Sequence, residues 1–120
     1  MNLKHSFNMS KEDVLQEACV KYFRLQYPSK IIYAIPNGGS RNIIEAVKLK
    51  RTGTLSGVAD LCVPCSNGKY HALFIELKVG KNKQSESQIT FKNKVEMFGN
   101  CYELVYSFDE FVKVVKKYFE

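Results

Sequence analysis

The sequence predicts an α/β fold, a small mixed sheet flanked by helices, with the element order α-β-α-β-β-α-β-α. Apolar residues recur at helical spacing in several segments, short runs rich in β-branched and aromatic residues lie between them, and an Asn-Gly pair joins two of those runs. The 120 residues, 45% hydrophobic and 25% charged, suit one globular domain. We assign this domain to residues 10–120, after a lead-in of residues 1–9.

The first helix is expected to start at Ser10 and to end near Gln26. Ser10 and Asp13 have the spacing of a capping box, and Pro28 lies just beyond the helix end. The predicted apolar face comprises Val14, Leu15, Ala18, Cys19, Tyr22 and Leu25. The apolar run at residues 31–35 then predicts a buried strand.

The middle of the chain is predicted to form a loop, a helix and a β-hairpin. A glycine-rich loop at residues 36–40 precedes a helix over residues 42–52. Residues 58–64 and 69–79 are expected to be antiparallel strands, because the Asn67-Gly68 pair between them is typical of a type I′ turn.

The last third of the chain is predicted to be helix, strand and helix. Ser85 and Gln88 have the spacing of a second capping box, which opens a helix that ends at Gly99. Residues 101–106 form the fourth strand and Ser107 starts the final helix. The inward-facing residues of that helix are Phe111, Val112, Val115, Tyr118 and Phe119.

The charge is positive and unevenly distributed. There are 18 Lys and Arg against 12 Asp and Glu, a net charge of +6, and residues 41–53 and 78–94 carry +3 and +4. Clustered bases favour a polyanionic partner, nucleic acid first, although a solvated lysine-rich surface is the alternative. The longest apolar run has five residues and no signal peptide is evident, so we expect a cytosolic protein with no membrane contact.

The four cysteines, Cys19, Cys62, Cys65 and Cys101, are expected to be reduced structural thiols. Cys62 and Cys65 form a CxxC motif, but it ends a predicted strand instead of opening a helix, where a redox thiol would gain its low pKa. A second ligand pair at the spacing of a zinc site is missing, so no zinc is expected.

Asp60, Glu76 and Lys78 are the strongest candidates for chemistry. A turn at Asn67-Gly68 pairs residue 60 with residue 75 and so places Asp60 beside Glu76, with Lys78 on the same face of the strand. Two adjacent carboxylates repel each other unless a cation lies between them, and Mg²⁺ or Mn²⁺ prefers such oxygen ligands. The alternative is an ion pair between Glu76 and Lys78 on a solvated strand.

Two further residues are candidates with plain structural alternatives. Glu17 lies at the edge of the first helix's predicted apolar face and could lean toward a metal, or be solvated. Gln88 could belong to the active site, or only complete the capping box, and the two roles are compatible.

Asp60…Glu76-x-Lys78 resembles the D…(D/E)xK core of the restriction-endonuclease-like, or PD-(D/E)XK, nucleases. The fuller pattern, over about residues 12–106, resembles the virus-type replication-repair nuclease (VRR-NUC) family. The matching pieces are Glu17, Pro36-Asn37-Gly38-Gly39-Ser40-Arg41, Lys50-Arg51-Thr52-Gly53, Gly57-Val58-Ala59-Asp60-Leu61, Ile75-Glu76-Leu77-Lys78 and Ser85…Gln88.

The resemblance implies a restriction-endonuclease-like fold and a set of active-site residues. Glu17, Asp60 and Glu76, with the Leu77 carbonyl, would hold Mg²⁺ or Mn²⁺. Lys78 would assist the water nucleophile, and Gln88 would lie in the active site.

The resemblance also implies a divalent-metal-dependent DNA endonuclease. A stand-alone, virus- or phage-type member would work in the cytoplasm of a bacterial host, as a homodimer on branched DNA such as four-way junctions. A non-catalytic nucleic-acid-binding module on a nuclease fold is the main alternative. A sequence-specific restriction enzyme and a thiol-redox protein rank below it.

The DNA backbone is expected to be held by two segments next to the acids in the sequence. The candidate residues are Asn37, Gly38, Gly39, Arg41, Lys48, Lys50 and Arg51. The glycine loop could instead be only a turn, and the basic run only an exposed helix face.

Overall fold

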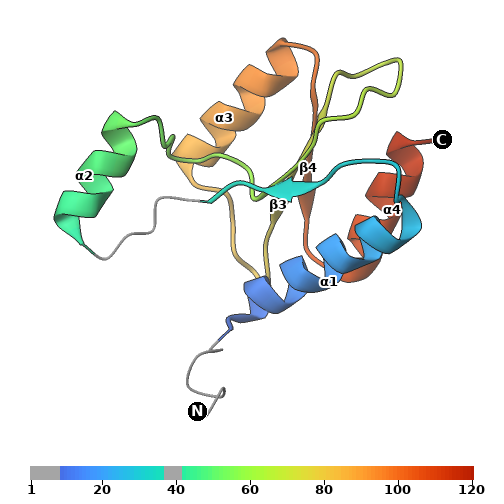
Figure 1. The fold of residues 1–120 in the computed structure, drawn as a ribbon, viewed down its shortest axis with the longest axis horizontal. Helices are drawn as coiled ribbons and strands as arrows, with labels where there is room; N and C mark the ends of the chain where they lie inside the picture. The colour runs from blue at the N-terminus through green and yellow to red at the C-terminus, as the bar shows by residue number, and fades with distance from the viewer. Residues whose placement is uncertain (1–8, 37–41) are drawn as a thin grey trace.

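The computed structural model describes residues 9–36 and 42–120 (Figure 1). The predicted order of helices and strands is confirmed. The elements are α1 (Lys11–Gln26), β1 (Tyr33–Ala34), α2 (Ile43–Arg51), β2 (Leu61–Val63), β3 (Leu73–Leu77), α3 (Glu86–Met97), β4 (Cys101–Val105) and α4 (Phe108–Tyr118). Within the described ranges, no helix is both long enough and apolar enough to cross a membrane.

The strands form one mixed sheet in the order β1-β2-β3-β4. The β1–β2 and β2–β3 pairs are antiparallel, and β3–β4 is parallel. A parallel pair needs a crossover connection, which α3 provides. The predicted mixed sheet flanked by helices is therefore confirmed.

One face of the sheet is covered by α1 and α4, which also pack against each other (Figure 1). Their fully buried residues include Cys19, Phe23, Phe111 and Val115. The strands contribute six residues to the same core: Leu61, Val63, Leu73, Ile75, Leu77 and Val105. These strand positions are all odd-numbered, as expected when alternate side chains point to opposite faces.

The other face of the sheet carries Phe74 and Glu76 and is covered by α3. The ring of Phe91, on α3, contacts Phe74 and Tyr102 edge-on. The first turn of α3 is fixed by the predicted capping box of Ser85 and Gln88. Successive side chains of β3 point to opposite faces of the sheet, so Glu76 points toward the start of α3 and away from the core formed with α1 and α4.

The prediction of a buried strand over residues 31–35 is wrong in extent and in burial. The strand is Tyr33–Ala34 only, both residues are exposed, and Ile31 is exposed as well. Only Ile32 of the run lies in the core. The reason is that β1 is an edge strand, which is hydrogen-bonded to a neighbouring strand, β2, on one side only.

The predicted type I′ turn at Asn67-Gly68 is also wrong. That turn needs positive φ at both residues, but only Gly68 has it, and the connection between the strands is long, running from Val63 to Leu73. Asn67 instead accepts hydrogen bonds from the amides of Lys69 and Tyr70 through Oδ1, at 2.9 and 2.7 Å. Its Nδ2 donates to the carbonyl of Tyr118, which ties this connection to α4.

Candidate active site

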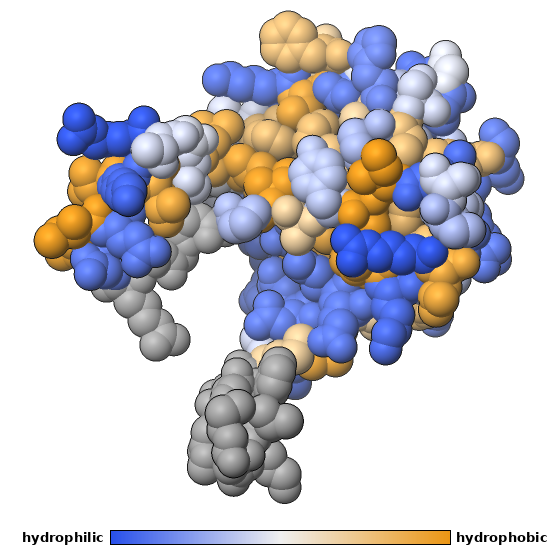
Figure 2. Space-filling model, in the orientation of Figure 1, coloured by the Kyte–Doolittle hydropathy of each residue, from blue (hydrophilic) through white to orange (hydrophobic). Residues whose placement is uncertain are grey.

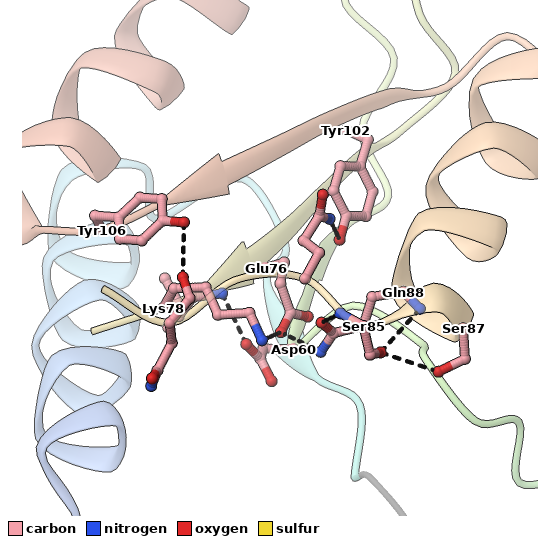
Figure 3. Close-up of polar contacts among 11 residues, drawn as sticks. Asp60, Glu76, Lys78, Ser85, Ser87, Gln88, Tyr102 and Tyr106 are labelled. Carbon is pink, nitrogen blue, oxygen red and sulfur yellow. Dashed lines mark hydrogen bonds and ion pairs between the residues drawn. The ribbon is translucent and has the colours of Figure 1, made fainter. Parts of the chain in front are cut away.

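Asp60 and Glu76 lie next to each other where β2 begins and β3 ends (Figure 3). The β2–β3 register pairs Leu61 with Ile75, one residue away from the predicted register. Extending the observed register by one step sets Asp60 directly opposite Glu76. The predicted juxtaposition of the two acids therefore holds although the predicted turn does not.

Asp60 is fixed by the backbone of the neighbouring strand. Its Oδ2 accepts a hydrogen bond from the amide of Leu77 at 2.7 Å, and its carbonyl accepts one from Ile35 at 2.9 Å. Burial raises the pKa of Asp60, and the Leu77 amide and Lys78 oppose that rise. A short bond from a backbone amide holds this carboxyl in one orientation.

Glu76 is a buried acid with one unsatisfied oxygen. Its exposed fraction is 2%. Gln88 Nε2 donates to Oε2 at 2.9 Å, and Lys78 Nζ lies 3.6 Å from the same oxygen. Among the described residues, Oε1 finds no hydrogen-bond partner although it is buried. A buried carboxylate oxygen normally has a partner, so this one indicates a site for an additional group.

Burial and charge together keep Glu76 protonated more than an ordinary glutamate. Burial is the largest effect and, with the charges of Asp60 and Glu12, raises the pKa of Glu76 to about 7, although Lys78 lowers it. The neighbouring Glu76 carboxyl in turn lowers the pKa of Asp60. The two acids therefore compete for one proton, as expected for like charges in a shared, partly dry site.

Lys78 lies on the same face as Glu76 but not on a solvated strand. The side chains of Lys78 and Glu76 are 12% and 2% exposed. The ion pair foreseen as the alternative does exist, yet it lies inside a site of two facing acids. Because both side chains are largely buried, the Glu76–Lys78 pair is not the exposed, weakly stabilising ion pair of the alternative interpretation.

Gln88 completes the capping box and also contacts the acid pair. Its backbone amide donates to Ser85 Oγ at 3.3 Å, and its Oε1 accepts from the Ser85 amide at 2.8 Å. The other half of the same amide group, Nε2, reaches Glu76 (Figure 3). The capping box thus orients Gln88 toward the acid pair.

The structure brings Glu12, and not Glu17, toward Asp60 and Glu76. Glu17 is exposed and lines a different hollow with Asp13 and Arg24. Glu12 is half-buried, and its pKa is raised by burial and by the charge of Asp60. Because each helical residue advances about 100°, Glu12 and Glu17 point about 140° apart around the helix.

Glu12 was not singled out from the sequence because the buried face of α1 was predicted at the wrong rotation about the helix axis. Val14 was expected on the apolar face, but it is 57% exposed. The fully buried residues of α1 are Cys19 and Phe23. Rotating the helix to bury Phe23 moves Glu12 toward the sheet and Glu17 away from it. The ligand role of Glu17 stays a prediction, without support from its position.

The predicted backbone-gripping residues lie in two places. Asn37, Gly38, Gly39 and Arg41 fall outside the described residues. The others, Lys48, Lys50 and Arg51, are on α2. Lys50 faces a pocket at the start of α3, whereas Lys48 and Arg51 line a hollow with Ile43, Ile44 and Val47.

Two facing carboxylates with a buried, unpaired oxygen fit a hard divalent cation better than any uncharged ligand. Across residues 9–36 and 42–120, however, no three His, Cys, Asp or Glu side chains converge on one metal position. Two acids of α1 act on the pair: the charge of Glu12 raises the pKa of Glu76, and the charge of Asp13 raises the pKa of Asp60.

The cysteines are free thiols, and Cys62 is unsuited to redox chemistry. Burial raises the pKa of Cys62 and raises the pKa of Cys19 to about 12. A redox thiol needs the opposite shift, because the thiolate is the reactive form.

Comparison with known proteins finds likeness in structure but not in sequence. No family model matches the chain, and no curated protein matches it. A solved structure named "VRR_NUC domain protein" superposes with a TM-score of 0.75 at 24% identity, covering 93% of this chain and 90% of that one. At this identity the likeness establishes the fold, and it confirms the predicted restriction-endonuclease-like architecture.

Proposed function

We propose that this chain is a divalent-metal-dependent DNA endonuclease of the VRR-NUC family. The observation that carries the proposal is the facing pair of Asp60 and Glu76, in which a buried Glu76 oxygen lacks a partner among the described residues. The fold shared with the VRR_NUC domain protein supports the same assignment. Fold alone would not justify it, because related folds host unrelated functions.

The metal would be held by the two acids and the backbone between them. Asp60, Glu76 and the Leu77 carbonyl would supply oxygen ligands, and an acid from α1 would complete the set, with Glu12 favoured over Glu17. Mg²⁺ or Mn²⁺ bound there would polarise the scissile phosphate and lower the pKa of a water molecule.

Side chains of the protein would orient the reacting groups and offset the negative charge that develops on the phosphate. Lys78 Nζ, 3.6 Å from Glu76 Oε2, would turn toward a phosphate oxygen or hold the attacking water. Gln88 would keep Glu76 in place through its hydrogen bond. The water oxygen would bond to phosphorus and give up one proton to solvent, the bond to one ester oxygen would break, and that oxygen would take up a proton from solvent.

DNA is the proposed partner because basic side chains flank the acids. The net charge is +6, and α2 carries Lys48, Lys50 and Arg51. Contacts to phosphates position a strand without reading its sequence, so cleavage should be structure-selective and sensitive to salt. Branched DNA, including four-way junctions, is the substrate that the family resemblance favours.

We also propose a homodimer. None of the residues of α2 is buried, and Ile43 and Ile44 are each 80% exposed. Figure 2 shows hydrophobic side chains gathered on the projecting lobe that α2 forms. A second copy of the chain is the occupant that the resemblance implies for such an apolar surface.

A cleavage panel tests the nuclease proposal. End-labelled single-stranded, duplex, flap, splayed-arm and four-way-junction DNA would be incubated with Mg²⁺, Mn²⁺ or EDTA. The wild type should cut only with metal, and Lys78→Ala should lose most of that activity. Lys116→Ala, which removes an exposed charge on α4, is the matched control and should cut normally.

The rival function is a non-catalytic DNA-binding module on the same fold. It predicts binding that is equal with and without metal and no cutting under any condition. Binding without cutting in the panel would therefore reject the nuclease proposal and favour the module.

A further inference from the structure

A pocket of about 330 Å³ lies between α2, the connection to β2 and the start of α3. Its lining includes Leu49 and Lys50 from α2, Leu55 and Ser56 from the connection to β2, and Ser87 and Gln88 from the start of α3. Small-molecule sites in proteins begin at about 300 Å³, so the volume suits one nucleotide unit but no duplex segment.

One wall of this pocket is a row of hydroxyl groups. Ser56 Oγ lies 3.4 Å from Ser87 Oγ. Ser87 Oγ in turn lies 3.1 Å from Ser85 Oγ (Figure 3). Lys50 adds a cationic side chain to the same lining. Hydroxyls and an ammonium group together can donate several hydrogen bonds to one phosphate.

Another part of the pocket wall is apolar and consists of Leu49 and Leu55. Leu55 is 59% exposed, so this wall is open to a ligand from solvent. A phosphate beside the less polar faces of a sugar and a base is the chemistry of a nucleotide. The mixed lining matches that pairing better than it matches a free anion.

Gln88 joins the pocket to the proposed catalytic residues. It lines the pocket and also donates to Glu76 Oε2 at 2.9 Å. A group held in the pocket is therefore separated from Glu76 by one side chain. Under the proposed function, a nucleotide held there would lie next to the scissile phosphate.

We propose that this pocket holds one nucleotide of the DNA strand, adjacent to the bond that is cut. Its phosphate meets Lys50 and the hydroxyls of Ser56 and Ser87, and its sugar packs on Leu49 and Leu55. The proposal rests on the proposed function for the identity of the strand. Such a contact sets the position of the strand and reads no sequence.

Binding without metal tests the pocket separately from catalysis. The probe is a fluorescein-labelled strand of thymidines, about ten long, and its affinity in EDTA is measured by anisotropy over a range of salt. Lys50→Ala should weaken binding about tenfold and lower the slope against log salt by about one. The double variant Ser56→Ala/Ser87→Ala should weaken binding about threefold, and Lys116→Ala should stay within about twofold of wild type.

The outcomes separate the two proposals. If Lys50→Ala binds like Lys116→Ala, or if the amide resonances of Ser56 and Ser87 do not move on adding the strand, the pocket assignment is overturned. Binding through the pocket without cleavage under Mn²⁺ upholds the pocket and rejects the nuclease. If Lys50→Ala cleaves DNA with an unchanged KM, the nuclease proposal is upheld and the pocket assignment is rejected. Tighter binding of a uridine RNA of the same length overturns the assignment to DNA.

Discussion

Glu76 concentrates three physical effects on one carboxyl group. Burial and the facing Asp60 both disfavour its charge, while Lys78 favours it. Among the described residues, Glu76 Oε1 has no hydrogen-bond partner, so these residues do not fully stabilise the charged form of Glu76. A divalent cation would do so, because it adds positive charge where two carboxylates meet.

The raised pKa of Glu76 predicts that metal-free protein loses stability as pH rises. The folded pKa of about 7 exceeds the ordinary value of 4.5, so the folded state binds more protons between these two values. The stabilisation is complete below about pH 4.5 and is lost as pH rises through 7, on the order of 3 kcal/mol in total. Thermal melts in EDTA across this range measure it.

Glu76→Gln is the matched variant for this pH effect. Glutamine does not ionise, so the melting temperature of this variant should depend much less on pH between the ordinary and the raised pKa of the glutamate. Adding Mn²⁺ should stabilise only the wild type. An equally steep pH dependence in Glu76→Gln would show that another group is responsible.

We predict different effects on cleavage for substitutions of Glu12 and Glu17, although both residues lie on α1. Glu12→Gln should reduce Mn²⁺-supported cleavage at least about tenfold, because its charge interacts with those of Asp60 and Glu76. Glu17→Gln removes an exposed charge and should stay within about twofold of wild type. A reversed order of the two variants in the cleavage assay would restore Glu17 as the α1 ligand.

At the scale of elements, local signals predicted the fold well. Ser10 with Asp13 and Ser85 with Gln88 form the two expected capping boxes, because such boxes depend only on residues three apart. The apolar spacing of the last helix was also informative, since its buried residues, Phe111, Val115 and Tyr118, are all among those predicted.

Features set by tertiary contacts could not be predicted in the same way. The run at residues 31–35 is apolar enough for a buried strand, but its place at the sheet edge leaves Tyr33 exposed. Asn67 is bound to α4 and so does not form the local turn that its sequence favours. The juxtaposition of Asp60 and Glu76 was still predicted, because a register error of one residue leaves the two side chains adjacent.

Gly57 fixes the distance between the connection before β2 and the start of α3. Its φ is +86°, and a Cβ there would lie 2.3 Å from the Ser87 carbonyl oxygen. Gly57→Ala should destabilise the fold by about 2 kcal/mol or more and displace Gln88 from Glu76.

Gly68→Ala is the control for this backbone effect. Gly68 has a similar φ of +90°, but a Cβ added to it would meet nothing within 4 Å, so this variant reports conformational strain without the clash. Chemical denaturation should find Gly57→Ala clearly less stable than Gly68→Ala. Equal losses would mean that the close approach to Ser87 is unimportant.

For the whole molecule, the apolar surface of α2 predicts self-association. Ile43 and Ile44 are exposed on a helix that contributes no buried residue to the core. Light scattering after size exclusion should give the mass of two chains for the wild type and of one chain for Ile44→Asp, with an unchanged circular dichroism spectrum. A monomeric wild type at all concentrations would contradict the homodimer.

The charge distribution links that assembly to the proposed substrate. The basic side chains of α2 lie on two faces, with Lys50 at the pocket that Gln88 also lines, and Lys48 and Arg51 beside the apolar residues. A dimer formed through α2 would therefore bring two sets of basic residues near one symmetry axis. That arrangement suits a branched DNA more than a single linear strand.

Calorimetric titration of Mn²⁺ into the wild type and into Glu76→Gln, at a pH slightly above neutral, tests the central claim most directly. We predict saturable binding to the wild type and at least about tenfold weaker binding to Glu76→Gln, with both proteins folded by circular dichroism. Equal binding by the two proteins, or a folded wild type that binds no Mn²⁺, would contradict the assignment of Asp60 and Glu76 as a metal site.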